Sequence, residues 1–139
     1  MSAAFAIDPK LLADGVVIGE TDLCAVLLMN DKRFPWFVLV PKVPGMSEIY
    51  DLDAAQRAAL MEESARFARA IMTHFRGDKC NIAALGNVVP QLHVHHIVRF
   101  KTDVAWPGPI WRFGQTELYG PGEIDAIRAR VHQALPFVR

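Results

Sequence analysis

The sequence predicts a single α+β domain in which helices cover an antiparallel sheet. The chain has 139 residues, with 15 basic and 15 acidic side chains, and this length is typical of one domain over residues 1–139. Strand-like segments occur in two groups, one long helix-like segment separates the groups, and a shorter helix-like segment closes the chain. This order favours an antiparallel sheet of roughly five strands over a doubly wound parallel sheet.

The composition excludes some classes of function. The formal net charge is zero, so no overall attraction draws the protein to nucleic acid or to an anionic membrane. No apolar run is long enough to span a bilayer, and the first residues lack the basic and apolar regions of a secretory signal. We therefore expect a cytoplasmic protein that binds neither nucleic acid nor membrane.

Three strand-like segments come first in the chain. Residues 16–18, 23–29 and 37–40 are rich in Val, Ile, Leu and Phe, which are residues that strands prefer. The polar residues and proline of segment 30–35 separate the last two segments, and such turn chemistry predicts a hairpin. Pro41 then ends this part of the predicted sheet.

A long amphipathic helix is predicted over residues 54–75. No Gly or Pro interrupts this segment, and apolar side chains recur three or four positions apart. Asp51 and Asp53 offer N-cap side chains at one end, and Gly77 is the predicted end of the helix. Such a helix provides one broad apolar face to cover the sheet.

The second half of the chain adds the remaining elements. Residues 80–85 and 91–100 are predicted strands, and a Gly-Asn turn lies between them. Segment 101–122 is rich in Gly and Pro and is predicted to be a loop. A short amphipathic helix over residues 124–135 closes the chain.

The segment Gln-Leu-His-Val-His-His at residues 91–96 is the most informative one for function. Alternate side chains of a strand share a face, so Gln91, His93 and His95 are predicted to project together. Polar groups on an apolar strand cost desolvation free energy unless they are hydrogen-bonded or used in chemistry. Imidazoles can bind a metal, transfer protons or attack an electrophile. These residues alone leave the three roles open.

A metal site receives less support than the other roles. Two histidines from one strand need a third protein ligand, and the sequence has no second His pair and no Cys pair with ligand spacing. We therefore expect no metal ion and no cofactor.

Residues 86–99 resemble the pattern of the histidine triad family, His-φ-His-φ-His-φ-φ, in which φ is an apolar residue. In this family a Gly-rich lead-in precedes the pattern, as Gly86 does here. Segment 35–42 is similar to a strand of the same family that ends in Pro-Lys. The resemblance covers about residues 23–99, with the long helix in the corresponding place. It implies the fold of that family (HIT-like) and a homodimer that joins two sheets.

The resemblance also implies a reaction. Members are nucleotide hydrolases or transferases that attack the α-phosphate of a nucleoside phosphate, here a dinucleoside polyphosphate or a nucleoside phosphoramidate. The middle triad position is His93, which would form a nucleotidyl-histidine intermediate. His95 would donate a hydrogen bond to a non-bridging phosphoryl oxygen, with backbone amides sharing the developing charge. Gln91 holds the first catalytic position.

Four polar residues match nucleotide-contacting positions by the same resemblance. Asn81 and Asn87 match positions that approach the phosphates and the leaving group. Asn30 matches the ribose-contacting position, and its neighbour Asp31 is an alternative because this loop is short. A side chain that hydrogen-bonds its own turn is the competing interpretation for each of them.

Three features depart from the family pattern or extend it. Gln91 replaces a histidine and cannot carry a proton. Trp36 stands where many relatives have another histidine, and we expect it to stack on a base or to pack in the core. The aromatic segment 106–111 is expected to flank this site or the site of a dimer partner. These departures keep two alternatives open, a nucleotide-binding module with little catalysis and a metal enzyme that uses His93 and His95.

Overall fold

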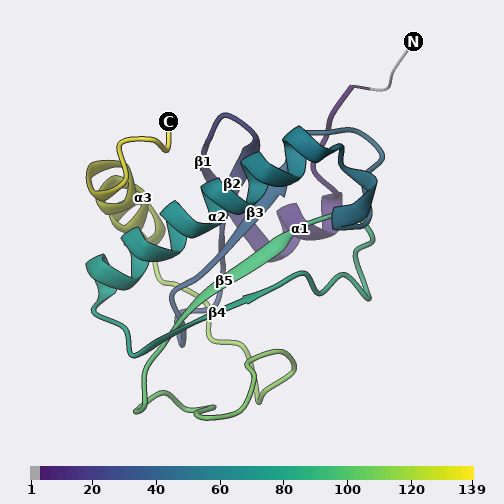
Figure 1. Ribbon diagram of the computed structural model, residues 1–139. Helices are drawn as coiled ribbons and strands as arrows, with labels where there is room; N and C mark the ends of the chain where they lie inside the picture. Colours follow the sequence, from purple (N-terminus) through teal and green to yellow (C-terminus); the bar gives the residue numbers. More distant parts are fainter. Residues whose placement is uncertain (1–3) are drawn as a thin grey trace.

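The computed structural model describes residues 4–139 and has a twisted antiparallel sheet at its centre (Figure 1). The five strands lie in the order β1-β2-β3-β5-β4, and every neighbouring pair is antiparallel. The predicted α+β class and the five-stranded antiparallel sheet are therefore confirmed. The strands are β1 (Gly15–Glu20), β2 (Cys24–Met29), β3 (Trp36–Pro41), β4 (Lys79–Ala83) and β5 (Val94–Arg99).

Helices cover both faces of this sheet. The long α2 (Ala54–Phe75) and the shorter α3 (Glu123–Ala134) pack on one face, where Phe67 and Val131 join the main apolar core (Figure 1). The short α1 (Pro9–Asp14) packs on the other face through Leu11. A single 3-10 turn, η1 (Ile49–Asp51), precedes α2. Within residues 4–139, none of these helices is both long and apolar enough to cross a bilayer.

Helix α2 occupies the residues that the sequence predicts. Asp53 accepts a hydrogen bond from the Gln56 amide at 2.8 Å, and Gln56 Oε1 accepts one from the Asp53 amide at 2.9 Å. This reciprocal capping box satisfies two amides that the first turn leaves without helical partners. The helix ends at Phe75, and its C-cap Arg76 has a left-handed backbone (φ 55°), one residue before Gly77, the predicted end.

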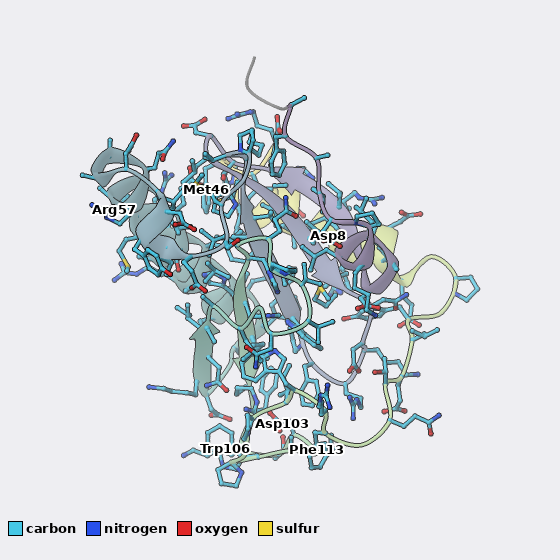
Figure 2. All side chains as sticks on the ribbon, turned by 90° about the vertical axis from the view of Figure 1, so that its right-hand side faces the viewer. Asp8, Met46, Arg57, Asp103, Trp106 and Phe113 are labelled. Atoms are coloured by element: carbon cyan, nitrogen blue, oxygen red, sulfur yellow. The ribbon has the colours of Figure 1, made fainter. Side chains whose placement is uncertain are left out.

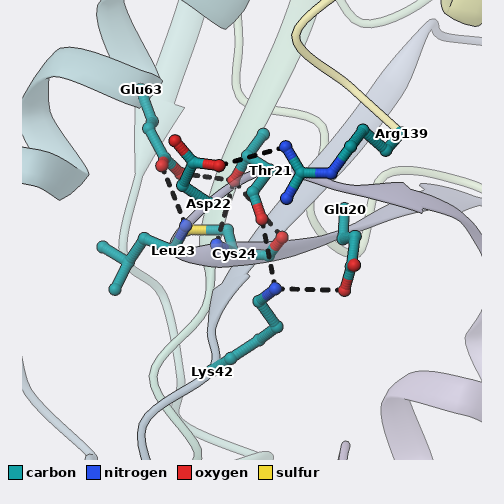
Figure 3. A network of polar contacts seen from close by, with 8 residues as sticks. All are labelled: Glu20, Thr21, Asp22, Leu23, Cys24, Lys42, Glu63 and Arg139. Atoms are coloured by element: carbon teal, nitrogen blue, oxygen red, sulfur yellow. Dashed lines mark hydrogen bonds and ion pairs between the residues drawn. The ribbon is translucent and has the colours of Figure 1, made fainter.

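A buried carboxylate connects α2 to the start of β2 (Figure 3). Glu63 accepts hydrogen bonds from the Thr21 hydroxyl and from the Leu23 amide, the latter at 2.9 Å. Thr21 Oγ1 in turn accepts a hydrogen bond from the Cys24 amide at 2.9 Å. The turn between β1 and β2 is therefore held by a side chain of the covering helix.

The structure corrects the predicted start of the histidine-bearing strand. Strand β5 begins at Val94, whereas the sequence predicts a strand from residue 91. The Leu92 amide donates to the carbonyl of Met46 instead of joining the sheet ladder. Gln91 and His93 therefore lie in the irregular segment before β5. Of the three residues predicted to project together, His95 alone lies within the strand. The predicted strand 80–85 likewise ends early, at Ala83.

Candidate functional site

His93 and His95 lie together on the sheet face that α1 covers. Their ring centroids are 4.9 Å apart with planes inclined at 70°. His95 pairs with Val38 of β3, whose side chain belongs to the apolar cluster on the α1 side. His96 points to the opposite face, where its Nε2 lies 2.7 Å from the Ser64 hydroxyl of α2. The predicted grouping of His93 and His95, and the separation of His96, are confirmed.

The two imidazoles open into a cavity of about 560 Å³. Residues from α1, β2, β3, the segment before β5 and the long loop after β5 form its walls. The lining residues are Lys10, Leu11, Asp14, Met29, Trp36, Leu85, Asn87, Val88, Val89, His93, His95, Trp111 and Arg112.

The tautomer of His93 follows from one hydrogen bond. Its Nδ1 lies 2.6 Å from the backbone carbonyl oxygen of Gln91. A carbonyl can only accept, so Nδ1 carries the proton and Nε2 keeps its lone pair. In residues 4–139 the one buried side-chain nitrogen or oxygen without a partner is Nε1 of Trp111. The unpartnered Nε2 of His93 is therefore not fully buried, and His93 lines both the main cavity and a smaller neighbouring one.

His95 is held in the opposite tautomer. The indole Nε1 of Trp36 lies 2.9 Å from Nδ1 of His95, and an indole can only donate. Nδ1 therefore accepts and Nε2 carries the proton, 3.3 Å from the Leu85 carbonyl oxygen. Burial, and then the neighbouring His93, lower the pKa of His95 from 6.5 to about 4. At neutral pH His95 is an uncharged hydrogen-bond donor.

Trp36 thus has a contact that the sequence did not predict. We expected base stacking or core packing, and its ring does line the cavity. Its indole N–H, however, is used on His95. Trp36 therefore fixes the tautomer of the neighbouring imidazole.

The long loop after β5 brings a second tryptophan to the cavity. The ring of Trp111 packs edge-on against His95, with centroids 5.3 Å apart. The expectation that the aromatic segment flanks the site is confirmed for Trp111 of this chain. Trp106 lies elsewhere, against the guanidinium of Arg99, and Figure 2 shows it on the loop close to Asp103.

Two cations and one carboxylate line the same cavity. Lys10 and Asp14, both on α1, form an ion pair of 2.9 Å. Arg112 follows Trp111 and has a left-handed backbone (φ 59°), a conformation that costs free energy for a residue with a Cβ. None of these three residues was predicted from the sequence. Asp8 and Pro9, an N-cap residue before a proline at the first helical position, are the signal that could have located α1.

Asn87 and Asn81 have different surroundings. Asn87 lines the main cavity, and it also lines a smaller one of about 170 Å³ with Gln91 and His93. Asn81 is not among the lining residues, and its Oδ1 accepts a hydrogen bond of 2.8 Å from Arg99. The structure therefore brings Asn87 to the histidines and leaves Asn81 beside them in the sheet.

Asn30 and Asp31 border a neighbouring cavity of about 340 Å³, which shares Asp14, Met29 and Trp36 with the main one. Both side chains have partners within the chain. Asn30 Oδ1 accepts a hydrogen bond of 3.0 Å from the Tyr119 amide. Asp31 is buried and holds Arg33 in a two-pronged ion pair, with a shortest distance of 2.7 Å. A ligand that contacts this position therefore meets a preorganised loop.

Gln91 binds backbone groups rather than the histidines. Its Oε1 accepts from the Asp8 amide and its Nε2 donates to the Ala6 carbonyl, each at 2.8 Å. These bonds hold the segment that leads into α1. The predicted common direction of Gln91, His93 and His95 is thus wrong for Gln91, because the chain around it is not a strand. Its carbonyl, not its side chain, contacts His93.

A buried ion pair supports the loop that carries Trp111. Arg99 donates to both carboxylate oxygens of Asp103, at 2.8 and 3.0 Å. Asp103 also accepts from the amides of Phe100 and Ala105. Although burial works in the other direction, these hydrogen bonds hold the pKa of Asp103 below its ordinary value. The first turn of the loop is therefore a defined structure.

No group of three or more His, Cys, Asp or Glu side chains within residues 4–139 could hold a metal ion.

Comparisons with known proteins show which family the chain resembles. The model of the HIT domain family matches residues 11–102. A histidine triad protein from Marinobacter aquaeolei VT8 is 44% identical, with coverage of 99% of this chain and 100% of that one and a TM-score of 0.94. A histidine triad protein from Bradyrhizobium japonicum is 41% identical, with coverage of 96% and 99% and a TM-score of 0.92. No curated protein matches the chain.

A more distant structure shares the fold alone. A hypothetical histidine triad nucleotide-binding protein from Sulfolobus tokodaii strain7 is 15% identical, with coverage of 91% and 89% and a TM-score of 0.67. The family match and the close structures agree with the fold. The chain belongs to the HIT domain family, a family of nucleotide-binding proteins.

Proposed function

We propose that the protein is a nucleotide hydrolase or transferase that attacks the α-phosphate of a nucleoside phosphate through His93. One observation carries the proposal. The Gln91 carbonyl fixes the proton of the neutral His93 imidazole on Nδ1, so that Nε2 of this cavity-lining residue keeps its lone pair. A neutral imidazole with a free lone pair, held by a backbone acceptor, is an activated nucleophile.

The neighbouring groups fit the charge that develops in this reaction. His95 lines the same cavity, and its Nε2–H would exchange the long 3.3 Å hydrogen bond to the Leu85 carbonyl for one to a non-bridging phosphoryl oxygen. Arg112 adds positive charge to the walls, whereas the charge of Lys10 is balanced by Asp14. The main cavity and the adjoining one, which share Trp36, together offer space for phosphate, ribose and base.

The reaction proceeds in two displacements. His93 Nε2 bonds to the α-phosphorus as the bond from phosphorus to the leaving group breaks. Water, or another acceptor, then attacks the phosphorus and the P–N bond breaks, which restores the imidazole. Water makes the enzyme a hydrolase and another acceptor makes it a transferase. Asn87 lies beside His93, where it can contact the leaving group.

The test is to trap the intermediate by rapid-quench mass spectrometry with an adenylyl substrate and with EDTA present. Wild-type protein is expected to gain one nucleotidyl group. His93→Ala should give no adduct and lose at least about a thousandfold in turnover, because the residue acts covalently. His74→Ala is the matched control, since His74 lies on α2, on the other face of the sheet. Turnover by His93→Ala, with no adduct on the wild type, would refute the mechanism.

The same experiment distinguishes a second candidate, a nucleotide-binding module without catalysis. Gln91 favours it, because an amide cannot carry a proton as the histidine of the family pattern can. Calorimetric binding of a nucleoside monophosphate, with no adduct and no turnover, would support the module. A requirement for metal ion, revealed by loss of activity in EDTA, would instead support a metal enzyme. We also propose a homodimer and a cytoplasmic location. Analytical ultracentrifugation tests the first, and cell fractionation tests the second.

A further inference from the structure

We propose that this site is selective for leaving groups that depart without a proton, so that it cleaves phosphoanhydrides and discriminates against phosphoramidates. The inference rests on the proposed function and names the substrate class for it. It comes from the hydrogen bond between Trp36 and His95.

The bond prevents His95 from acting as an acid. A cationic imidazole needs protons on both nitrogens, but Nδ1 of His95 faces the indole N–H of Trp36 at 2.9 Å. Protonation of Nδ1 would place two donors against each other in a buried position, 4% exposed. The depressed pKa of His95, about 4, agrees with this geometry. The proton on Nε2 of a neutral imidazole can form a hydrogen bond but is not released at neutral pH.

The other groups around His95 do not replace the missing acid. His93, whose ring is 4.9 Å away, is the nucleophile, and Trp111 and the Leu85 carbonyl carry no titratable proton. Gln91 cannot carry a proton either. Of the charged residues that line the cavity, Asp14 is paired with Lys10 and the guanidinium of Arg112 does not deprotonate. Lys10 is the remaining acid, and its side chain is 55% exposed and paired with Asp14.

The two substrate classes differ in what the leaving atom needs. In an anhydride, the bridging oxygen takes the electron pair of the P–O bond and departs as a stable phosphate anion, while Nε2 of His93 bonds to phosphorus. The attacking water later releases one proton to solvent as the P–N bond breaks. In a phosphoramidate, the departing nitrogen would leave as an amide anion unless an acid protonates it during the step.

The primary test compares two substrates with a common nucleotide. We would measure kcat/KM for diadenosine triphosphate and for an N-alkyl adenosine 5′-phosphoramidate, with EDTA present. General acid catalysis contributes about 10²–10⁴-fold, so the anhydride should be favoured by at least about a hundredfold. A smaller ratio overturns the inference, and so does phosphoramidate cleavage that Lys10→Met abolishes. Absence of the histidine adduct with both substrates would instead refute the proposed function.

A second test examines Trp36 as a positioning residue. Trp36→Phe keeps an aromatic ring and removes the donor to His95. Nitrogen-15 NMR of the wild type should show His95 protonated on Nε2 only and free of titration above pH 5. In the variant, titration of His95 should move to higher pH, and the preference for the anhydride should shrink about tenfold or more below pH 6.5.

Trp106→Phe is the matched control for that variant, because Trp106 lies against Arg99 and is not among the residues that line the cavity. It should leave the His95 signals and the substrate ratio unchanged. Circular dichroism checks that Trp36→Phe folds. If the folded variant keeps both the wild-type titration of His95 and the wild-type substrate ratio, the inference is overturned.

Discussion

Replacing Arg99 by Met should severely destabilise the protein, because it leaves the buried carboxylate of Asp103 without its partner. The two side chains are 1% and 4% exposed and form a two-pronged ion pair. Arg99 also donates to Asn81 at 2.8 Å. Methionine keeps most of the side-chain volume but offers none of these hydrogen bonds.

The structure sets the expected magnitude. Removal of one partner of a buried ion pair costs about 3–5 kcal/mol, because the charge that stays behind is neither solvated nor neutralised. Arg128→Met is the matched control, since Arg128 forms a 2.8 Å ion pair with Asp125 at 37% and 79% exposure. An exposed pair of this kind contributes about 1 kcal/mol or less. The two variants therefore test burial with the same change of side chain.

Urea unfolding followed by far-ultraviolet circular dichroism measures both free energies, with the denaturant slope compared among the variants. The measurement should be repeated near pH 4. In Arg99→Met, the unpartnered Asp103 takes up a proton at low pH and loses its charge, so the destabilisation should be smaller there than at pH 7. Equal losses for Arg99→Met and Arg128→Met, or a loss that does not change with pH, would refute this reasoning.

Two further predictions concern the other buried polar groups. Burial lowers the pKa values of His95 and His96 from 6.5 to about 4, so the unfolded chain binds protons between these values that the folded protein does not. The free energy of unfolding should fall as the pH falls from 6.5 to 4, by on the order of 3 kcal/mol for each imidazole. His96→Gln should lose less on acidification than the wild type, and an equal loss in urea titrations would contradict the assignment. Glu63→Ala should cost about 2–3 kcal/mol in the same assay, because the Thr21 hydroxyl and the Leu23 amide lose a charged acceptor. Glu63→Gln should cost less, since its amide oxygen can still accept from Leu23, and a larger loss for Gln than for Ala would exclude this explanation.

The regular elements could be predicted from the sequence because local signals agree there. Helix α2 has the N-cap Asp53, no Gly or Pro, and an apolar face that Phe67 and Ile71 bury. Helix α1 was missed because six residues are too few for a helical period, although Asp8 and Pro9 mark its start. Alternation along a strand placed His93 beside His95, and their rings do lie together.

The same alternation failed for Gln91, because whether a strand extends that far depends on a long-range partner. The amide of Leu92 binds Met46, which is 46 positions away in the chain. The contacts of Trp36 and Arg112 also depend on segments that meet only in the folded protein. A pattern of single residues shows which groups are available for chemistry, but here the tautomers of His93 and His95 were set by a carbonyl and an indole.

The two hydrogen bonds of the Gln91 side chain affect how the protein should be handled in the laboratory. They fasten residues 6–8 to the lead-in of β5, directly before the helix whose Lys10 and Leu11 form one wall of the cavity. A shortened chain that begins at Pro9 would lose both hydrogen bonds, and α1 would no longer be held in place beside the cavity. An affinity tag is therefore better placed after Arg139, or before Ala6 with a spacer. A crystallisation variant that begins at Pro9 would give a misleading view of how ligands enter the cavity.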